Sequence, residues 1–258
     1  MYNVPTLLIG LGGIGSRIAS MVSDRMTDDE KRYVSALAVD TDFYSIDSLC
    51  TDAGQSANTE DISVKEFFEK YPEALDWYNN NPAFRLRIPT RGDQVCGSPT
   101  LSFYDAFKEG RLDALHKAID RINRVNGSPV SSCLRVLIVG SLCGGTSSGL
   151  LFQVPLYIRY YMRLLNISNV FVRGLFITPD VLRDVVENKS IEKALLFNSY
   201  ACINELNSFY RKQTAPACES PASMPFYDLC RNTASPRVSD TEDTVSGPMQ
   251  KAWRVLVA

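Results

Sequence analysis

The amino-acid sequence predicts an α/β protein in which a parallel β-sheet carries helices on both faces. Short, continuously apolar runs, which are typical of strands buried on both sides, alternate along the chain with segments whose apolar residues recur at helical spacing. Two of the strand-to-helix transitions run through glycine-rich stretches. The 258 residues suffice for one such domain, and 45% hydrophobic with 22% charged residues is a composition typical of globular proteins.

The predicted strands and helices follow each other in an order that suits a parallel sheet. Strands are expected at 5–10, 34–42, 133–141 and 169–179. Helices are expected at 16–26, at 101–125 with a break near Gly110, at 149–165 and at 191–210. This alternation favours strands that run in one direction and are joined by helices packed on the sheet.

The remaining segments are less regular. Residues 43–83 are more polar and are expected to hold short helices, one of them in VKEFFEKY, and 84–100 are expected to be an extended piece and a loop. Residues 212–248 are rich in Pro, Ser, Thr and Asp and are predicted to be mostly irregular, before a short closing helix or strand. The sequence therefore predicts one domain over 1–211 and a Pro/Ser/Thr-rich tail over 212–258.

Composition excludes several classes of function. The net charge is −2 and the basic residues are scattered, so neither a nucleic acid nor an acidic membrane surface is an expected partner. Seven cysteines without a Cys-x-x-Cys pair indicate buried thiols in a reducing compartment, and the single histidine, His116, argues against a zinc site. There is no signal-peptide pattern and no apolar stretch of membrane-spanning length, so a cytoplasmic protein is expected.

The first glycine-rich stretch is GLGGIGS, which fits the pattern GxGxxG through Gly10, Gly12 and Gly15. Glycine lets the backbone approach a ligand closely, and the N–H groups at the start of a helix favour anions, so a phosphate is the expected ligand. Dinucleotide-binding folds and ATP-using adenylating enzymes share this pattern. Asp40 and Asp42, at the end of the second strand, stand roughly where a ribose-binding acid is found in such folds.

The second stretch, GSLCGGTSSG at 140–149, adds a further set of small residues, N–H groups and hydroxyls that suits a di- or triphosphate. No Gly-Lys-Ser/Thr follows, so it is not a Walker A loop. Because the loop supplies no positive side chain, backbone dipoles and a metal ion would have to balance the phosphate charge.

Taken together, these stretches resemble the tubulin/FtsZ superfamily, and most closely its divergent bacterial tubulin-like branch. CGGTSSG resembles the family signature GGGTGSG, with Cys143 and Ser147 in place of glycines, and LIGLGGIGSRIA resembles its first phosphate loop. LAVDTDFYSIDSL and FITPD resemble later nucleotide loops of the family, and IEKALLFNSYACINEL resembles the helix that follows them. The resemblance covers about residues 4–210 and implies a Rossmann-like GTPase domain.

The resemblance also implies a ligand and the residues that bind it. The ligand would be GTP or GDP with Mg²⁺. The α- and β-phosphates would contact the first loop, and the β- and γ-phosphates the second. Asp40 and Asp42 would lie near the magnesium or its waters, and Pro179 and Glu192 near the ribose. The residues implied in the two loops are Gly12, Gly13, Ile14, Gly15 and Ser16, and Gly144, Gly145, Thr146 and Ser147.

Hydrolysis is expected to be weak or absent. Tubulins hydrolyse GTP across a subunit contact, where the second subunit supplies an acidic loop that follows a long helix, and 212–258 show no such loop. The sequence therefore predicts a nucleotide-binding half without the partner-activating half, whether the C-terminus is natural or truncated. No catalytic residue is assigned. The resemblance implies self-association or a tubulin-like partner subunit.

Two other interpretations remain at this stage. One is a Rossmann-type enzyme that uses NAD(P) or ATP through GLGGIGS, against which stand the second loop and the absence of a Tyr-x-x-x-Lys pattern. The other is an interaction scaffold whose degenerate loops bind no nucleotide. Cys143 and Ser147, which stand where the family signature has glycines, are consistent with this interpretation.

Overall fold

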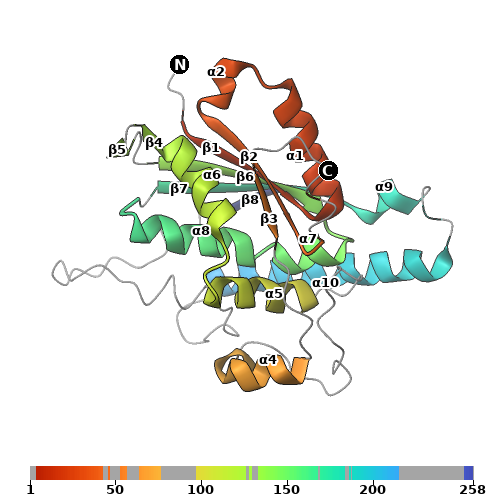
Figure 1. Cartoon of the computed structure of the whole chain (residues 1–258). Coiled ribbons are helices and arrows are strands. Elements are labelled where there is room, and N and C mark those ends of the chain that lie inside the picture. The colour runs from red at the N-terminus through yellow and green to blue at the C-terminus, as the bar shows by residue number, and fades with distance from the viewer. Residues whose placement is uncertain are drawn as a thin grey trace.

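A central sheet of parallel strands organises the molecule (Figure 1). The computed structural model describes residues 4–42, 46, 53–56, 64–76, 97–125, 128–129, 133–167, 169–183, 186, 188–214 and 253–257. Within these residues the sheet has six strands in the order β3-β2-β1-β6-β7-β8, and every neighbouring pair is parallel. The strands are β1 Thr6–Leu11, β2 Val34–Asp40, β3 Ala53–Ser56, β6 Cys133–Ser141, β7 Asn169–Ile177 and β8 Trp253–Val257.

Helices connect the strands. The longer ones are α1 Gly12–Arg25, α5 Gly97–Lys108, α6 Asp113–Asn123, α8 Gln153–Leu164 and α10 Lys189–Thr214. The shorter ones are α2 Asp28–Lys31, α4 Val64–Lys70, η1 Pro72–Asp76, α7 Gly145–Leu150 and α9 Pro179–Arg183. A small antiparallel ribbon pairs β4 Arg124–Val125 with β5 Ser128–Pro129. The alternation of strand and helix confirms the predicted α/β class.

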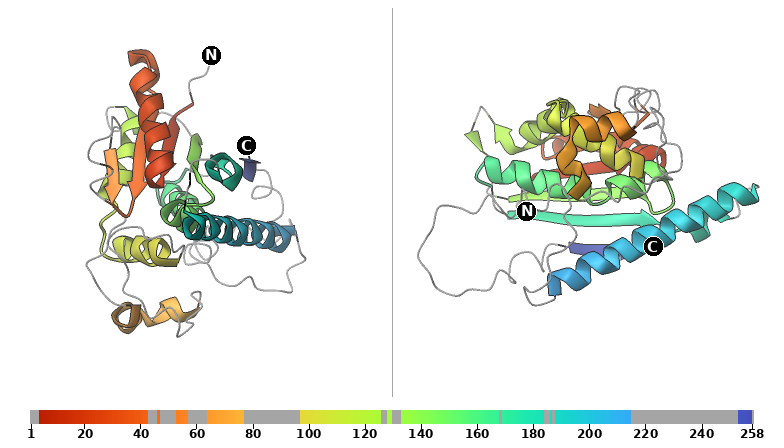
Figure 2. Two further views of the ribbon diagram at one scale, coloured as in Figure 1. Left: turned by 90° about the vertical axis from the view of Figure 1, so that its right-hand side faces the viewer. Right: turned by 90° about the horizontal axis from the view of Figure 1, so that it is seen from below.

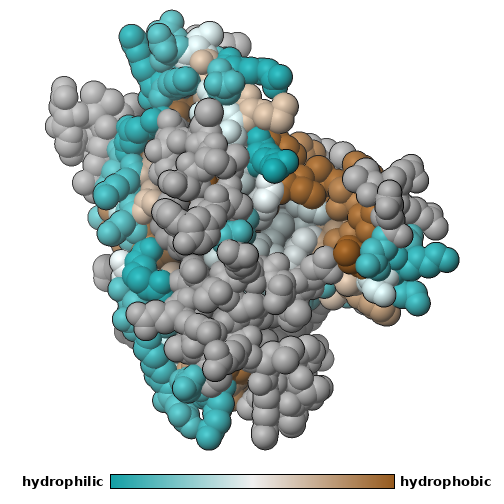
Figure 3. Space-filling model, turned by 45° about the vertical axis from the view of Figure 1, so that its right-hand side comes forward, coloured by the Kyte–Doolittle hydropathy of each residue, from teal (hydrophilic) through white to brown (hydrophobic). Residues whose placement is uncertain are grey.

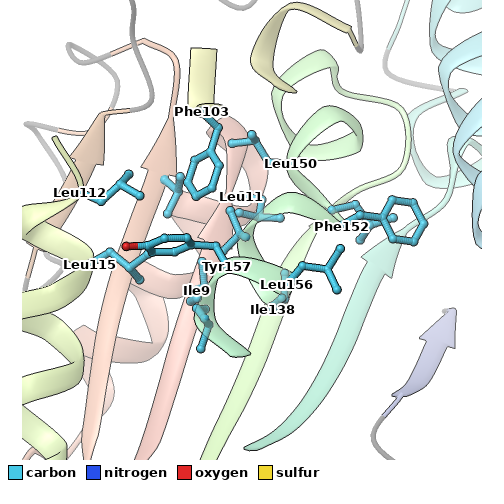
Figure 4. Packing of buried hydrophobic residues seen from close by; sticks show 14 of the residues in the cluster. Ile9, Leu11, Phe103, Leu112, Leu115, Ile138, Leu150, Phe152, Leu156 and Tyr157 are labelled. Atoms are coloured by element: carbon cyan, nitrogen blue, oxygen red, sulfur yellow. The ribbon is translucent and has the colours of Figure 1, made fainter. Parts of the chain in front are cut away.

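Side chains alternate across the sheet, so each face has its own core. On one face Leu8, Ala36 and Val139 pack against Ala19 of α1. On the other face Ile9, Leu11 and Ile138 belong to a larger cluster that includes Phe103 of α5, Leu115 of α6 and Tyr157 of α8 (Figure 4). Both views of Figure 2 show helices on the two sides of the sheet. The expectation of a sheet covered on both faces is confirmed for β1, β2 and β6.

The strand β7 is covered on one face only within the described part of the chain. Val170, Val172 and Phe176 are buried in the larger cluster. The residues between them point the other way, and Phe171 and Leu175 are 52% and 40% exposed. Figure 3 shows hydrophobic residues gathered on one part of the surface, beside the projecting end where Figure 1 places α9 and the start of α10.

Helix α4 lies outside α5 and is attached to it by rings and charges (Figures 1 and 2). Phe67 and Tyr71 make edge-on contacts with Tyr104. The buried Asp105 carboxylate accepts hydrogen bonds from the Lys70 ammonium at 3.0 Å and from the Tyr71 hydroxyl at 2.9 Å, and it pairs with Arg111.

Within the described ranges, no helix is long and apolar enough to cross a membrane.

The four predicted strands are present within two residues of their expected ends, and the chain breaks between helices at Gly110, whose φ is +68°. The strand β3 was not expected. Its sequence, Ala-Gly-Gln-Ser, has no β-branched or aromatic residue, so pairing with β2 decides its conformation. Helix α5 begins at Gly97, inside the segment predicted as a loop.

The helix predicted over 149–165 is two helices. Pro155 explains the break, because it has no N–H to bond the carbonyl of Leu151 and its ring crowds that carbonyl. Helix α10 continues to Thr214, and the closing segment, for which a helix or a strand was expected, is the strand β8. Residues 215–252 lie outside the described residues, so the irregular tail and the domain boundary at 211 stay predictions.

Candidate functional site

The two glycine loops meet at the carboxyl edge of the sheet. Strands β1 and β6 are neighbours, and the order of strands along the chain reverses direction between them. In doubly wound sheets ligands bind outside this point of reversal. Gly12, in the first loop, lies against the second loop: a Cβ built on it would be 3.4 Å from the nitrogen of Ser147 and 3.5 Å from Cβ of Thr146.

Glycines allow this close approach. Gly12 has a φ of +66°, in the left-handed region that other residues rarely adopt. A Cβ on Gly10 would clash with the carbonyl oxygen of Gly15, and one on Gly15 would clash with the carbonyl oxygen of Val139 on β6. The start of α1 is therefore pressed directly against the backbone of the two central strands.

Two other glycines face open space. A Cβ on Gly13 or on Gly144 would have no neighbouring atom within 4 Å. Gly13 lies in the first turn of α1, and Gly144 is the residue that precedes α7. Neither helix start is capped by a side chain, and neither first turn contains an acidic residue. Backbone N–H groups in the first turn of a helix have no partner within the helix and favour anions.

The serine hydroxyls of the loops bind the protein's own backbone. Ser16 is buried, and its hydroxyl donates to the carbonyl of Gly10 at 3.2 Å. The hydroxyl of Ser147 accepts the N–H of Ser141 at 2.9 Å. Both residues were expected to contact phosphate, and the structure places them in the loops, where their side chains brace the turns. Ile14 is half-buried in the same first turn of α1.

Asp40 connects the end of β2 to the second loop. Its Oδ1 accepts the N–H of Thr41 at 2.7 Å and the hydroxyl of Thr146 at 3.1 Å. The hydroxyls of Thr41 and Thr146 are 3.0 Å apart. Asp42 is half-buried beside them, and its N–H is 3.3 Å from the same Oδ1 of Asp40. Thr41 is a site residue that the sequence analysis missed, although it stands between two predicted ones.

Pro179 and Glu192 lie together between α9 and α10, beyond the end of β7. They line a cavity of about 120 Å³, whose other lining residues are Asp180, Leu182, Val186, Leu195 and Leu196. Helix α10 is joined to the second loop nearby, since the Asn198 side chain donates to the carbonyl of Cys143 at 3.0 Å. No sequence pattern pointed to Asn198.

Cys143, which replaces a glycine of the family signature, is fully buried. Burial raises the pKa of its thiol above the usual value, and the nearby Asp180 carboxylate raises it further. The thiol therefore stays protonated near neutral pH, and the side chain fills space in the loop.

The geometry thus defines a doubly wound α/β domain with two glycine loops, a buried carboxylate and a small cavity along one edge. Among the described residues, no group of three or more His, Cys, Asp or Glu side chains could hold a metal ion alone. The structure brings every predicted site residue to this edge or to the elements next to it.

Comparison with known proteins identifies the family. A family model described as "Tubulin like" matches residues 94–235, which is more than half of the chain. The chain belongs to this tubulin-like family, as the sequence predicted. A search of curated proteins gave no match.

Solved structures of related proteins are similar at low identity. CetZ2 from Haloferax volcanii, in a GTPγS-bound protofilament, is 16% identical, and the match covers 78% of this chain and 57% of CetZ2 with a TM-score of 0.39. TubZ from Bacillus thuringiensis serovar israelensis, in a GTPγS-form protofilament, is 14% identical over 82% of this chain and 43% of TubZ, with a TM-score of 0.42. The chain therefore spans about half the length of these proteins.

Proposed function

We propose that the chain binds GTP or GDP at the carboxyl edge of the sheet, with the polyphosphate lying across the two glycine loops. The contact of Gly12 with Thr146 and Ser147 carries the proposal, because it joins two uncapped helix starts at one place. The open space at Gly13 and Gly144 would admit phosphate oxygens to backbone N–H groups. Membership of the tubulin-like family supports guanine as the base.

Magnesium fits the chemistry of this edge. Mg²⁺ prefers oxygen ligands and is commonly held by one or two carboxylates together with phosphate oxygens and waters. The half-buried carboxylate of Asp42 would hold the ion or its waters, and the phosphates would complete its coordination. When bound, Mg²⁺ would neutralise charge on the phosphates, for which the loops themselves offer only backbone dipoles.

Hydrolysis is proposed to be slow, because the residues proposed to contact the polyphosphate would only bind it, and no residue in the described part of the chain is assigned to activate water. Incubation of the purified chain with GTP and Mg²⁺ should release little phosphate over hours. Rapid turnover would contradict this part of the proposal.

Thermal unfolding with added nucleotides tests the binding. GTP and GDP should raise the Tm, whereas ATP, NAD and NADP should not, because only a ligand that binds the folded state stabilises it. A response to NAD(P) or ATP alone would favour a Rossmann-type enzyme, and no response would favour a scaffold.

A pair of matched variants makes the test specific to the site. Gly13→Asp introduces a carboxylate into the open space at the start of α1, where it should repel phosphate and lower GTP affinity about tenfold or more. The new acid favours the helix start, so the fold should be kept. Met21→Asp places the same charge on the same helix at an exposed position and should leave GTP affinity unchanged.

A further inference from the structure

We infer that Asp40 is a positioning residue, which holds the second glycine loop in place for the polyphosphate by fixing the hydroxyl of Thr146. This inference rests on the proposed function and assigns one residue a task within the same site. It distinguishes Asp40 from Asp42, which the family resemblance places together near the metal ion.

The carboxylate of Asp40 is hydrogen-bonded to groups of the protein itself. Asp40 is only 5% exposed, and its Oδ1 accepts hydrogen bonds from the N–H of Thr41, the N–H of Asp42 and the hydroxyl of Thr146, with the Thr41 hydroxyl at the longer distance of 3.5 Å. Two of these donors belong to the chain just after β2, and the third belongs to α7, more than a hundred residues later. A single oxygen atom therefore ties two separate segments of the site together.

The hydroxyl protons define which way Thr146 acts. A carboxylate can only accept, and the Thr146 hydroxyl lies 3.1 Å from Oδ1 of Asp40 whereas the Thr41 hydroxyl lies 3.5 Å from it, so we assign the one proton of Thr146 to Asp40. In the 3.0 Å contact between the two threonines, Thr41 is then the donor and Thr146 the acceptor. The side chain of Thr146 consequently has no proton for a phosphate oxygen. The phosphate donors of this loop would be backbone N–H groups.

Fixing Thr146 also fixes those N–H groups. Thr146 is the second residue of α7, it is 6% exposed, and it forms the surface against which Gly12 lies. Without Asp40, its hydroxyl would lose the charged acceptor and keep only the hydroxyl of Thr41 as a partner in a buried place, which is unfavourable, and the first turn of α7 would relax away from α1. The contact between the two loops would then be lost.

Substitutions can separate the effect of the negative charge of Asp40 from its effect on the position of the second loop. A carboxylate near a polyphosphate opposes its binding by Coulomb repulsion. Asp40→Asn keeps an oxygen that accepts the same three donors and removes the charge, whereas Asp40→Leu removes the acceptor at similar size. Thr146→Val and Thr146→Ser form the corresponding pair on the partner residue, without and with the hydroxyl.

The test measures dissociation constants of GTPγS, GDP and GMP by calorimetry, with Mg²⁺ and with EDTA. Asp40→Leu and Thr146→Val should weaken GTPγS about tenfold, the effect of one lost hydrogen bond to a charged group, and weaken GMP less than about twofold. Asp40→Asn and Thr146→Ser should bind GTPγS at least nearly as tightly as the wild-type chain. Thr27→Val, which removes an exposed hydroxyl at the start of α2, is the control and should change none of the constants.

Several outcomes would overturn the inference. Equal weakening of GMP and GTPγS would indicate a general loss of structure. If Asp40→Asn lost as much of its Mg²⁺-dependent GTPγS affinity as Asp40→Leu, this would indicate that Asp40 acts through its charge on the metal ion. Unchanged GTPγS affinity in Thr146→Val would show that the hydroxyl positions nothing, and this variant carries the test if Asp40→Leu does not fold. A wild-type chain that binds none of the nucleotides would instead refute the proposed function, and this inference with it.

Discussion

Gly15 and Gly144 both belong to the glycine loops, but their surroundings differ. A Cβ on Gly15 would clash with the carbonyl oxygen of Val139, which is backbone and cannot turn away. A Cβ on Gly144 would meet no atom within 4 Å, and the φ of −77° at this residue suits any amino acid. The first glycine is thus required by packing, whereas the second faces open space.

This difference predicts opposite results for the same substitution. Gly15→Ala should lower the free energy of unfolding by about 1–3 kcal/mol, the usual effect of overpacking, as measured by urea denaturation. Gly144→Ala should leave that free energy within about 0.5 kcal/mol of the wild-type value. Equal stabilities for the two variants would mean that α1 does not press on β6 as described.

Residue patterns predicted which segments meet at the candidate site, but could not predict the contacts of each side chain. Ser16 and Ser147 were expected to contact phosphate because hydroxyls suit phosphate. In the structure their hydroxyls bond Gly10 and Ser141, partners that depend on how the turn closes. Asn198 carries no signal in the sequence, since its bond to Cys143 exists only because α10 packs beside the second loop.

At the scale of the elements, His116 joins α6 to α8. Its ring is stacked on Tyr161, with centroids 4.2 Å apart, and its Nε2 lies 2.6 Å from the Tyr157 hydroxyl. Burial lowers the pKa of His116 from the usual 6.5, and the carboxylates of Asp113 and Asp120 oppose this shift in part. The neutral ring is therefore the form that suits the packed helices.

The lowered pKa of His116 determines how the stability of the chain depends on pH. Around pH 6 the unfolded chain binds more protons at this residue than the folded chain, so the free energy of unfolding should fall as the pH is lowered from about 8 to about 5.5. His116→Phe keeps an aromatic ring and removes the titrating group, so its stability should vary less over this range. Burial raises the pKa of Glu205 as well, so the effect of His116, the only histidine, is measured as the difference between urea titrations of the wild-type chain and of the variant at several pH values. An unchanged slope in the variant would contradict this account.

Helices and strands could be predicted where neighbouring residues in the sequence form a clear hydrophobic pattern. The strands β1, β2, β6 and β7 have continuous or alternating apolar runs, and pattern alone located them. The strand β3 has no such run and exists by pairing with β2. The start of α5 at Gly97 was missed because Gly-Ser-Pro suggests a turn in isolation.

At the scale of the whole molecule, the order β3-β2-β1-β6-β7-β8 places the two glycine loops side by side. Among the described residues, nothing covers one face of β7. Helix α1 covers the face formed by β1, β2 and β6, whereas Phe171 and Leu175 on β7 are exposed to solvent. Parallel sheets usually have both faces covered, and exposed apolar patches of this kind promote association.

The purified chain should therefore associate as its concentration rises. Sedimentation velocity over a hundredfold range of concentration should show a growing sedimentation coefficient, and the double variant Phe171→Thr with Leu175→Thr should reduce this growth while keeping strand-forming residues. Val22→Thr, an exposed change on α1, is the matched control. A wild-type chain that stays monomeric throughout would contradict the prediction.

The glycine contacts at the carboxyl edge have a consequence for how this family can diversify. Gly10 and Gly15 touch neighbouring backbone, so a side chain at either position would have to displace the sheet itself. Gly13 and Gly144 carry no such constraint. A carboxylate can therefore arise at these two positions by a single base change without displacing the sheet, so the ligand preference of this edge can change there at little cost to the fold.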